Sequence, residues 1–337
     1  MNQTNFQFKF QKRKIIVTIF SLFLGFGLLS LTLWKILEVD WNQVVGNIKS
    51  INPFTYFFAM ASYYASIWLR GTRWKKICQT AKISDNETLP TVKNFSGMVL
   101  MGWFLNSVAP MRLGDAHRGW TLARESNSHF SKSIGTVFAE KIQDIFIIIF
   151  LLMFAILALK STGYFQPPLW ISVLSTMLLS IVVILIIIMK NTGNFFTKML
   201  PFGIGKFYDN FYKSTLGSFS KKTISSHLLF GILAWVAEIM RFYFVADAMN
   251  IEIPLNIIVF STVAAALLWT VPIPGGLGFV EGGVIGLLVL FGLSETSAVS
   301  LVAIERTISW LSIILFGGLL FIWWHTIRGL PNFNKSE

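Results

Sequence analysis

Eight charged residues lie within or beside long apolar stretches of the chain, and they are the first candidates for chemistry: Glu140, Lys141, Asp144, Glu238, Arg241, Glu281, Glu305 and Arg306. A charge in an apolar segment is costly unless it faces the protein interior and finds a partner. Glu140 and Asp144 are four residues apart, and Glu238 and Arg241 are three apart, so each pair shares a helix face. We therefore expect these groups to point inward and to pair.

Arginine guanidinium groups are suited to bind phosphate, because they donate two parallel hydrogen bonds. Arg112, Asp115 and Arg118 form a further charged cluster in the chain. With Arg241 and Arg306, the arginines of this cluster predict a polar cavity that attracts an anion. The alternative is that the acidic–basic pairs only neutralise one another and fix helix packing.

Other kinds of chemistry have weaker support in the sequence. The histidines are scattered, and the single cysteine leaves no thiolate cluster, so we predict neither a metal nor another cofactor. No G-x-x-x-x-G-K-[ST] pattern for nucleotide binding occurs. Paired carboxylates could still serve as a general base, which keeps a membrane-embedded transferase open as an alternative.

Two short motifs interrupt apolar segments: "NSVAPMRLGDAHRG" (106–119) and "WTVPIPGGLGFVEGG" (269–283). Proline ends a helix, and glycine permits tight turns and close approach. The residues assigned to these breaks are Pro110, Gly114, Pro272 and Pro274. Gly275, Gly276 and Gly278, at the second break, are predicted to contact the headgroup of a bound substrate. A new half-helix is expected to begin near Gly278, where free N–H groups would suit a phosphate.

The two motifs also indicate an internal duplication. Pro110 aligns with Pro274, and Gly114 with Gly278, at an offset of 164 residues. Further on, "GTVFAEKIQD" (135–144) resembles "SLVAIERTIS" (300–309). This alignment pairs Glu140 and Lys141 with Glu305 and Arg306. We predict one repeat over residues 54–165 and a second over residues 227–328.

The composition requires a membrane. The chain is 54% hydrophobic and 13% charged, with a mean hydropathy of +0.64, which is too apolar for a soluble domain. We predict a single all-α polytopic domain over residues 1–337, with about six full crossings and two re-entrant broken-helix segments. The crossings centre on Ile15–Trp34, Phe54–Leu69, Ile145–Leu159, Leu169–Met189, His227–Ala248 and Ala298–Trp324, and the re-entrant segments on Val92–Val108 and Leu255–Phe291.

Basic residues orient this arrangement. The net charge of +12 is explained by basic cytoplasmic loops rather than by nucleic acid, and both termini are predicted to be cytoplasmic. Loops over Arg70–Lys93 and Arg112–Lys132 lie inside only if Val92–Val108 is re-entrant. Residues 190–225 are interpreted as a basic segment on the cytoplasmic membrane face. An odd number of crossings separates the repeats and inverts one of them, which is an architecture of transporters.

The two break motifs resemble a known family. The stretch from Pro110 to Arg118 is similar to a P-x-R-x-G-[DE]-x-x-R signature, and the stretch from Pro274 to Glu281 to P-G-G-x-G-x-x-E. Both resemble the lysylphosphatidylglycerol synthase transmembrane region, the flippase-like part of the multiple peptide resistance factors. The resemblance covers residues 15–325 and implies movement of a lipid between leaflets.

The resemblance implies a flippase or scramblase in a bacterial or archaeal cytoplasmic membrane, with membrane lipids as partners. Its lipid would be anionic or headgroup-modified, such as an aminoacyl-phospholipid or a polyprenyl-phosphate-linked lipid. We expect no lysyltransferase activity, since the chain ends soon after its last apolar segment. Two alternatives stay open: a transferase related to phosphatidylglycerol lysyltransferase, and a non-transporting partner of a lipid- or glycan-biosynthetic enzyme.

Overall fold

The computed structural model describes residues 40–84, 89–162, 201–270 and 273–328, with the single residues 177 and 180. These residues form helices, turns and loops and contain no strand, so the all-α prediction is confirmed. The predicted crossings Ile15–Trp34 and Leu169–Met189, the break residue Pro272 and both chain ends lie outside the described residues.

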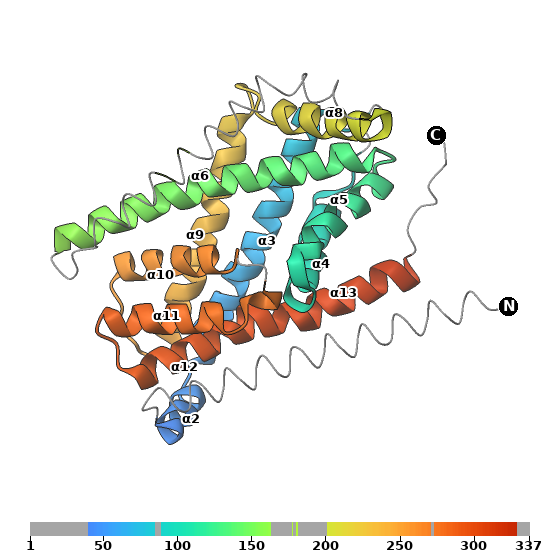
Figure 1. The fold of residues 1–337 in the computed structure, drawn as a ribbon. Coiled ribbons are helices and arrows are strands. Elements are labelled where there is room, and N and C mark those ends of the chain that lie inside the picture. The colour runs from blue at the N-terminus through green and yellow to red at the C-terminus, as the bar shows by residue number, and fades with distance from the viewer. Residues whose placement is uncertain are drawn as a thin grey trace.

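The helices follow one another along the chain with short connections (Figure 1). Their bounds are α2 Trp41–Lys49, α3 Pro53–Ala81, α4 Val92–Val108, η1 Pro110–Arg112, α5 Leu113–Glu125, α6 Phe130–Thr162, α8 Phe202–Gly217, α9 Ile224–Ala248, α10 Leu255–Leu268, η2 Pro274–Gly276, α11 Phe279–Leu290, α12 Glu295–Arg306, η3 Thr307–Leu311, η4 Ile313–Gly317, α13 Gly318–Ile322 and η5 Trp323–Ile327.

Helices α3 and α9 form an antiparallel pair along their length (Figure 1). The Asn52 N–H donates to the Ala248 carbonyl at 2.9 Å, which joins the start of α3 to the end of α9. Asn52 also caps α3 through its side chain. Pro53 is in the first turn, where a backbone N–H would have no partner within the helix, so proline costs nothing there. The antiparallel pairing is what an inverted repeat requires.

Helix α3 extends beyond the predicted segment Phe54–Leu69. It continues through Arg70 and Arg73, which the sequence analysis placed in a cytoplasmic loop. The prediction of a loop is wrong, because both arginines are in a helix and are only 7% and 0% exposed. Both guanidinium groups meet carboxylates on neighbouring helices, so the helix can continue with its charges buried.

Each predicted re-entrant segment is a helical hairpin that reverses at its break (Figure 1). Helix α4 turns into α5 at Pro110–Arg112, and α10 turns into α11 at Pro274–Gly276. With 14 and 12 residues, α10 and α11 are shorter than a helix that crosses a hydrocarbon core of about 30 Å, whereas α4, with 17, is at the lower limit. Entry and exit of each hairpin on one side of the membrane stays a prediction.

Close packing at glycines draws the first hairpin together. A Cβ at Gly114 would lie 1.9 Å from the carbonyl oxygen of Gly102, so α5 touches the backbone of α4. The Gly114 N–H donates to Asn106 Oδ1 at 2.8 Å, which satisfies a donor at the start of α5. Gly114 thus has the structural role that the sequence predicted at this break.

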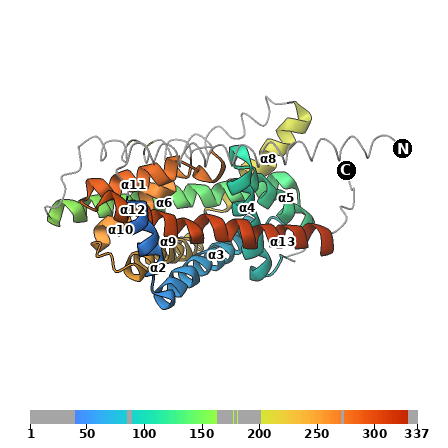
Figure 2. The same cartoon turned by 90° about the horizontal axis from the view of Figure 1, so that it is seen from below.

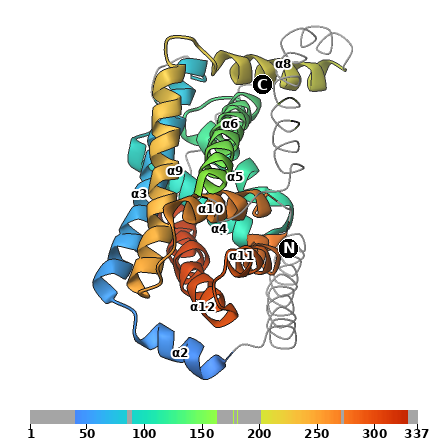
Figure 3. The same ribbon diagram turned by 90° about the vertical axis from the view of Figure 1, so that its left-hand side faces the viewer.

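Three described helices are long and apolar enough to cross a membrane: Phe130–Leu159 in α6, Ile224–Ala248, and the continuous helix Glu295–Ile327. Helix α6 and the α12–α13 helix pass across the α3–α9 pair, as Figures 1 and 2 show. Figure 3 views α6 lengthwise, with α10, α11 and α12 grouped beside the same pair. The order of long helix, broken hairpin and long helix occurs twice, while the exact repeat boundaries stay a prediction.

Helix α8 lies across one end of the bundle, against α6 and the end of α3 (Figure 1). It belongs to the predicted basic segment 190–225, of which the residues from 201 are described. Ile204 and Phe207 are exposed on it, and Lys213 is 67% exposed in its side chain. An exposed surface that mixes apolar and basic side chains is typical of a helix at a membrane face.

Candidate functional site

A cavity of about 380 Å³ lies among the long helices and the two hairpins. This volume falls within the range of small-molecule sites. Charged residues from four helices line part of its wall: Arg70, Asp115, Lys141, Asp144, Glu238 and Arg241. Apolar residues line another part: Ile145, Ile148, Phe242, Ala265, Val280 and Val284. The cavity can therefore bind a molecule that has both a charged and an apolar part.

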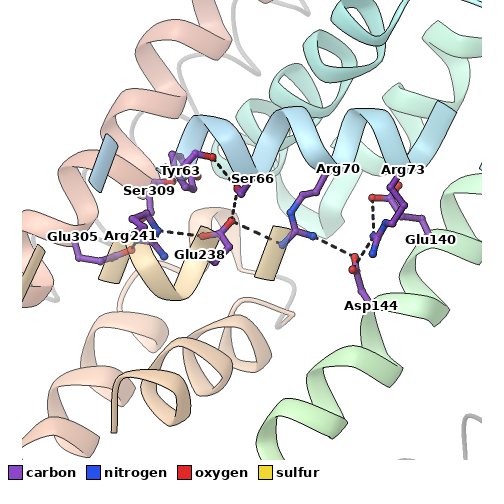
Figure 4. Close-up of polar contacts among 10 residues, drawn as sticks. All are labelled: Tyr63, Ser66, Arg70, Arg73, Glu140, Asp144, Glu238, Arg241, Glu305 and Ser309. Atoms are coloured by element: carbon purple, nitrogen blue, oxygen red, sulfur yellow. Dashed lines mark hydrogen bonds and ion pairs between the residues drawn. The ribbon is translucent and has the colours of Figure 1, made fainter. Parts of the chain in front are cut away.

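A chain of buried ion pairs begins between α3, α6 and α9 (Figure 4). Arg73 lies 2.7 Å from Asp144 and 3.3 Å from Glu140. Arg70 lies 3.5 Å from Asp144 and 3.9 Å from Glu238, so it links α6 to α9. These contacts form around α3, whose two arginines occupy the centre of the cluster.

The chain of ion pairs continues into the first hairpin. Arg118 on α5 lies 2.5 Å from Glu140 and 3.8 Å from Asp115. Asp115 also lies 3.3 Å from Lys141 and 3.3 Å from Arg112. All five residues were predicted as site residues, and the structure brings them together.

In the other direction the chain of ion pairs reaches the second hairpin. Arg241 pairs with Glu238 at 3.1 Å, which confirms the pairing predicted from their spacing, and it also pairs with Glu305. Arg306 lies 2.9 Å from Glu281 and 3.9 Å from Glu305. One continuous network therefore runs from Arg112 to Glu281.

The network is organised in the same way in both halves. Arg73 of α3 pairs with Glu140 of α6, and Arg241 of α9 pairs with Glu305 of α12. The two arginines are 168 residues apart, and the two glutamates 165. The long helices of each half are thus joined by an equivalent ion pair.

The next residue along α6 and α12 makes a second equivalent contact. Lys141 reaches back to Asp115 on α5, and Arg306 reaches back to Glu281 on α11. The adjacent acidic and basic residues of each repeat motif therefore serve different partners instead of only neutralising each other. They tie each hairpin to the long helix that follows it.

The second break has a local carboxylate cap. The Gly278 N–H, expected to be free for a phosphate, donates to Glu281 Oε2 at 2.7 Å. That expectation is wrong for this amide, because Glu281 fills the site where an anion would bind. Gly275, Gly276 and Gly278 have φ values of +62°, +65° and +85°, a region that glycine adopts without strain. The glycines therefore allow the backbone to turn, and the Glu281 carboxylate accepts the hydrogen bond of the Gly278 N–H.

The two breaks touch each other. Arg112 donates to the Trp269 carbonyl at 3.1 Å, and its guanidinium lies 5.0 Å from the Trp269 ring centroid. A Cβ at Gly275 would lie 3.3 Å from the Ser107 carbonyl oxygen and 2.6 Å from Trp310 Nε1. Arg112 itself has a φ of 53°, an unfavourable value for a non-glycine residue, so tertiary contacts hold it there.

Sequence reasoning missed Arg70 and Arg73 as members of the site. A signal was present, since Tyr63, Ser66, Arg70 and Arg73 follow helical spacing on one face of α3. Their role depends on carboxylates far away in the sequence. The described residues hold no group of three or more metal-ligating side chains, so nothing in that part of the chain points to a metal.

The fold and the site define a helical membrane protein with a buried, charged cavity between two broken hairpins. The family model of the lysylphosphatidylglycerol synthase TM region matches residues 18–317. The chain therefore belongs to this family.

Similar proteins occur in archaea. A UPF0104 membrane protein of Methanocaldococcus jannaschii is 31% identical over 223 residues, which cover 65% of this chain and 93% of that protein. A UPF0104 membrane protein of Methanothermobacter thermautotrophicus is 23% identical, covering 89% of this chain and 92% of that protein. A third, from Pyrococcus horikoshii, is 25% identical over 78% of this chain and 85% of that protein.

Proposed function

We propose that this protein is a flippase or scramblase that moves a lipid with an anionic or modified headgroup between the leaflets. The observation that carries the proposal is a cavity lined by both charged and apolar residues. A phosphate headgroup would lie against arginines, while the acyl or prenyl chain would remain against apolar side chains and the bilayer. Membership in the lysylphosphatidylglycerol synthase TM region family supports a lipid-related role.

The broken hairpins support transport over simple binding. Irregular backbone at membrane depth is tolerated where protein or a water-filled cavity surrounds it, and transporters place substrates at such breaks. Here the breaks touch through Arg112 and Trp269, beside the cavity. Separation of the hairpins would open the cavity, and their contact would close it.

The contacts of the carboxylates favour transport over an acid–base enzyme. Glu140 accepts from both Arg73 and Arg118, and Asp144 accepts from both Arg70 and Arg73. Each of these carboxylates is therefore already occupied by hydrogen bonds from two guanidinium groups. The paired carboxylates are better suited to fix the arginines than to remove a proton.

We also propose an orientation. Lys75, Lys82 and Lys132 lie near the end of the bundle that α8 covers, where α3 ends and α6 begins. The positive-inside rule would place this end, and with it α8, in the cytoplasm. The same rule underlies the proposal of a bacterial or archaeal cytoplasmic membrane with cytoplasmic termini.

The test is lipid translocation by purified protein in vesicles, measured by quenching of a headgroup-labelled phospholipid in the outer leaflet. Arg112→Ala should slow translocation about tenfold or more, because it removes a cavity guanidinium. Its side chain is 26% exposed, so the fold should lose only about 1 kcal/mol. Lys49→Ala, on α2 outside the cavity lining, is the control. Normal translocation by a folded Arg112→Ala variant would contradict this site.

A further inference from the structure

The charges around the cavity do not balance. The described lining residues include five cations, Arg70, Arg112, Lys141, Arg241 and Arg306, and four carboxylates, Asp115, Asp144, Glu238 and Glu305. The larger ion-pair network adds Arg73 and Arg118 on one side and Glu140 and Glu281 on the other, which leaves the excess of one cation unchanged. Among the described residues the empty site thus has one uncompensated positive charge.

Four hydrogen-bond donors on the lining also lack an acceptor within the described part of the chain. They are Arg70 Nε, Trp235 Nε1, Arg306 Nη2 and Ser309 Oγ. Trp235 and Arg70 are 5% and 7% exposed, so their polar atoms have little access to bulk water. A buried donor without a partner is unfavourable, and an oxygen-rich ligand would satisfy these donors.

From these two observations we infer that the cavity selects a headgroup with one net negative charge, namely a phosphodiester whose other substituent is an uncharged polyol. This inference rests on the proposed function and names its substrate class. One phosphodiester charge neutralises the excess cation, and the phosphate and hydroxyl oxygens accept from the unpartnered donors.

Other headgroups would leave a charge unbalanced. A phosphomonoester with two charges would turn the excess into a negative one. A zwitterionic headgroup would leave the positive charge uncompensated, and an aminoacylated headgroup with a net positive charge would increase it. Unbalanced charge is costly where the groups that face it are buried, as Arg70, Glu238 and Arg241 are. The charge balance therefore separates phosphodiester–polyol lipids from aminoacyl-lipids.

Thr270 provides a way to change this balance without breaking an ion pair. It lines the cavity and is exposed, and its hydroxyl donates to the Leu267 carbonyl. Thr270→Asp would cancel the excess charge, and Thr270→Lys would double it. Thr270→Asn matches the aspartate in shape and leaves the charge unchanged, so it is the control.

The experiment measures translocation of five labelled lipids, one at a time, in vesicles of phosphatidylcholine. Two are monoanionic diesters, phosphatidylglycerol and a polyprenyl-phosphoglucose, which differ in their tails. The others are phosphatidic acid, phosphatidylethanolamine and lysyl-phosphatidylglycerol. We expect at least one diester to move about tenfold faster than the last three, since one unit charge at a few ångströms is worth several RT.

The variants add a second comparison. Thr270→Asp should remove the preference for the diester, Thr270→Lys should shift the preference towards phosphatidic acid, and Thr270→Asn should behave as the unmodified protein does. Equal movement of all lipids, or fastest movement of lysyl-phosphatidylglycerol, would overturn the inference and leave the proposed function standing. If the folded protein moves none of the five lipids, the proposed function fails and the inference fails with it.

Discussion

Replacement of Arg73 by methionine tests whether the ion-pair network holds the helices together. The Arg73 side chain is fully buried, and it lies 2.7 Å from Asp144 and 3.3 Å from Glu140. Its removal leaves Glu140 with Arg118 and Asp144 with the longer 3.5 Å contact to Arg70. Breaking a buried pair by removing one partner costs about 3–5 kcal/mol.

For a chain of 337 residues that loss corresponds to a fall in the melting temperature of roughly 4–7 °C. The assay is thermal unfolding of the detergent-purified protein, with Lys75→Met as control. Lys75 lies on α3 two residues away and is partly exposed. The double variant Arg73→Met with Asp144→Asn should lose less than the sum of the single variants, by about 0.5–3 kcal/mol. Melting of Arg73→Met within about 1 °C of the unmodified protein would refute the structural role assigned to this arginine.

Two further substitutions test the broken hairpins. Gly114→Ala should destabilise the protein by about 1–3 kcal/mol or more, because the added Cβ would lie 1.9 Å from a carbonyl oxygen of α4. A Cβ at Gly286 would meet no atom of the described structure within 4 Å, apart from its own helix backbone, so Gly286→Ala should be neutral or stabilising in the same melting experiment. Equal effects of the two substitutions would contradict the close packing at Gly114. Glu281→Gln keeps an oxygen for the Gly278 N–H but loses the charge beside Arg306, whereas Glu281→Ala loses both. The alanine variant should therefore have a free energy of unfolding about 1 kcal/mol lower than that of the glutamine variant, and a lower melting temperature. Identical melting temperatures would argue against the cap.

Local sequence patterns were sufficient for much of the fold. The prolines and glycines of the two motifs predicted where each hairpin turns, because their backbone preferences act within a few residues. The three-residue spacing of Glu238 and Arg241 predicted their ion pair, since helix geometry alone brings them together.

Features that depend on distant partners were not predictable in this way. Arg70 and Arg73 follow an apolar run and resemble the start of a basic loop. Their burial depends on Asp144, which is more than 70 residues away in the sequence. The hydrogen bond from the Gly278 N–H to Glu281 could have been predicted from the sequence, because a glycine followed three residues later by a glutamate matches capping-box spacing.

The most direct test of the central claim is whether lipid occupies the cavity. Cys78 is the only cysteine and is buried, so a cysteine introduced at Thr270 would be the accessible thiol. The measurement is the rate of modification of Thr270→Cys by a charged thiol reagent, with and without phosphatidylglycerol in the micelle. Lys213→Cys on α8, where the side chain is 67% exposed, serves as the reference. The account predicts that the lipid slows modification at Thr270→Cys about tenfold and leaves the Lys213→Cys rate unchanged. Equal rates at Thr270→Cys with and without the lipid would contradict a headgroup site in this cavity.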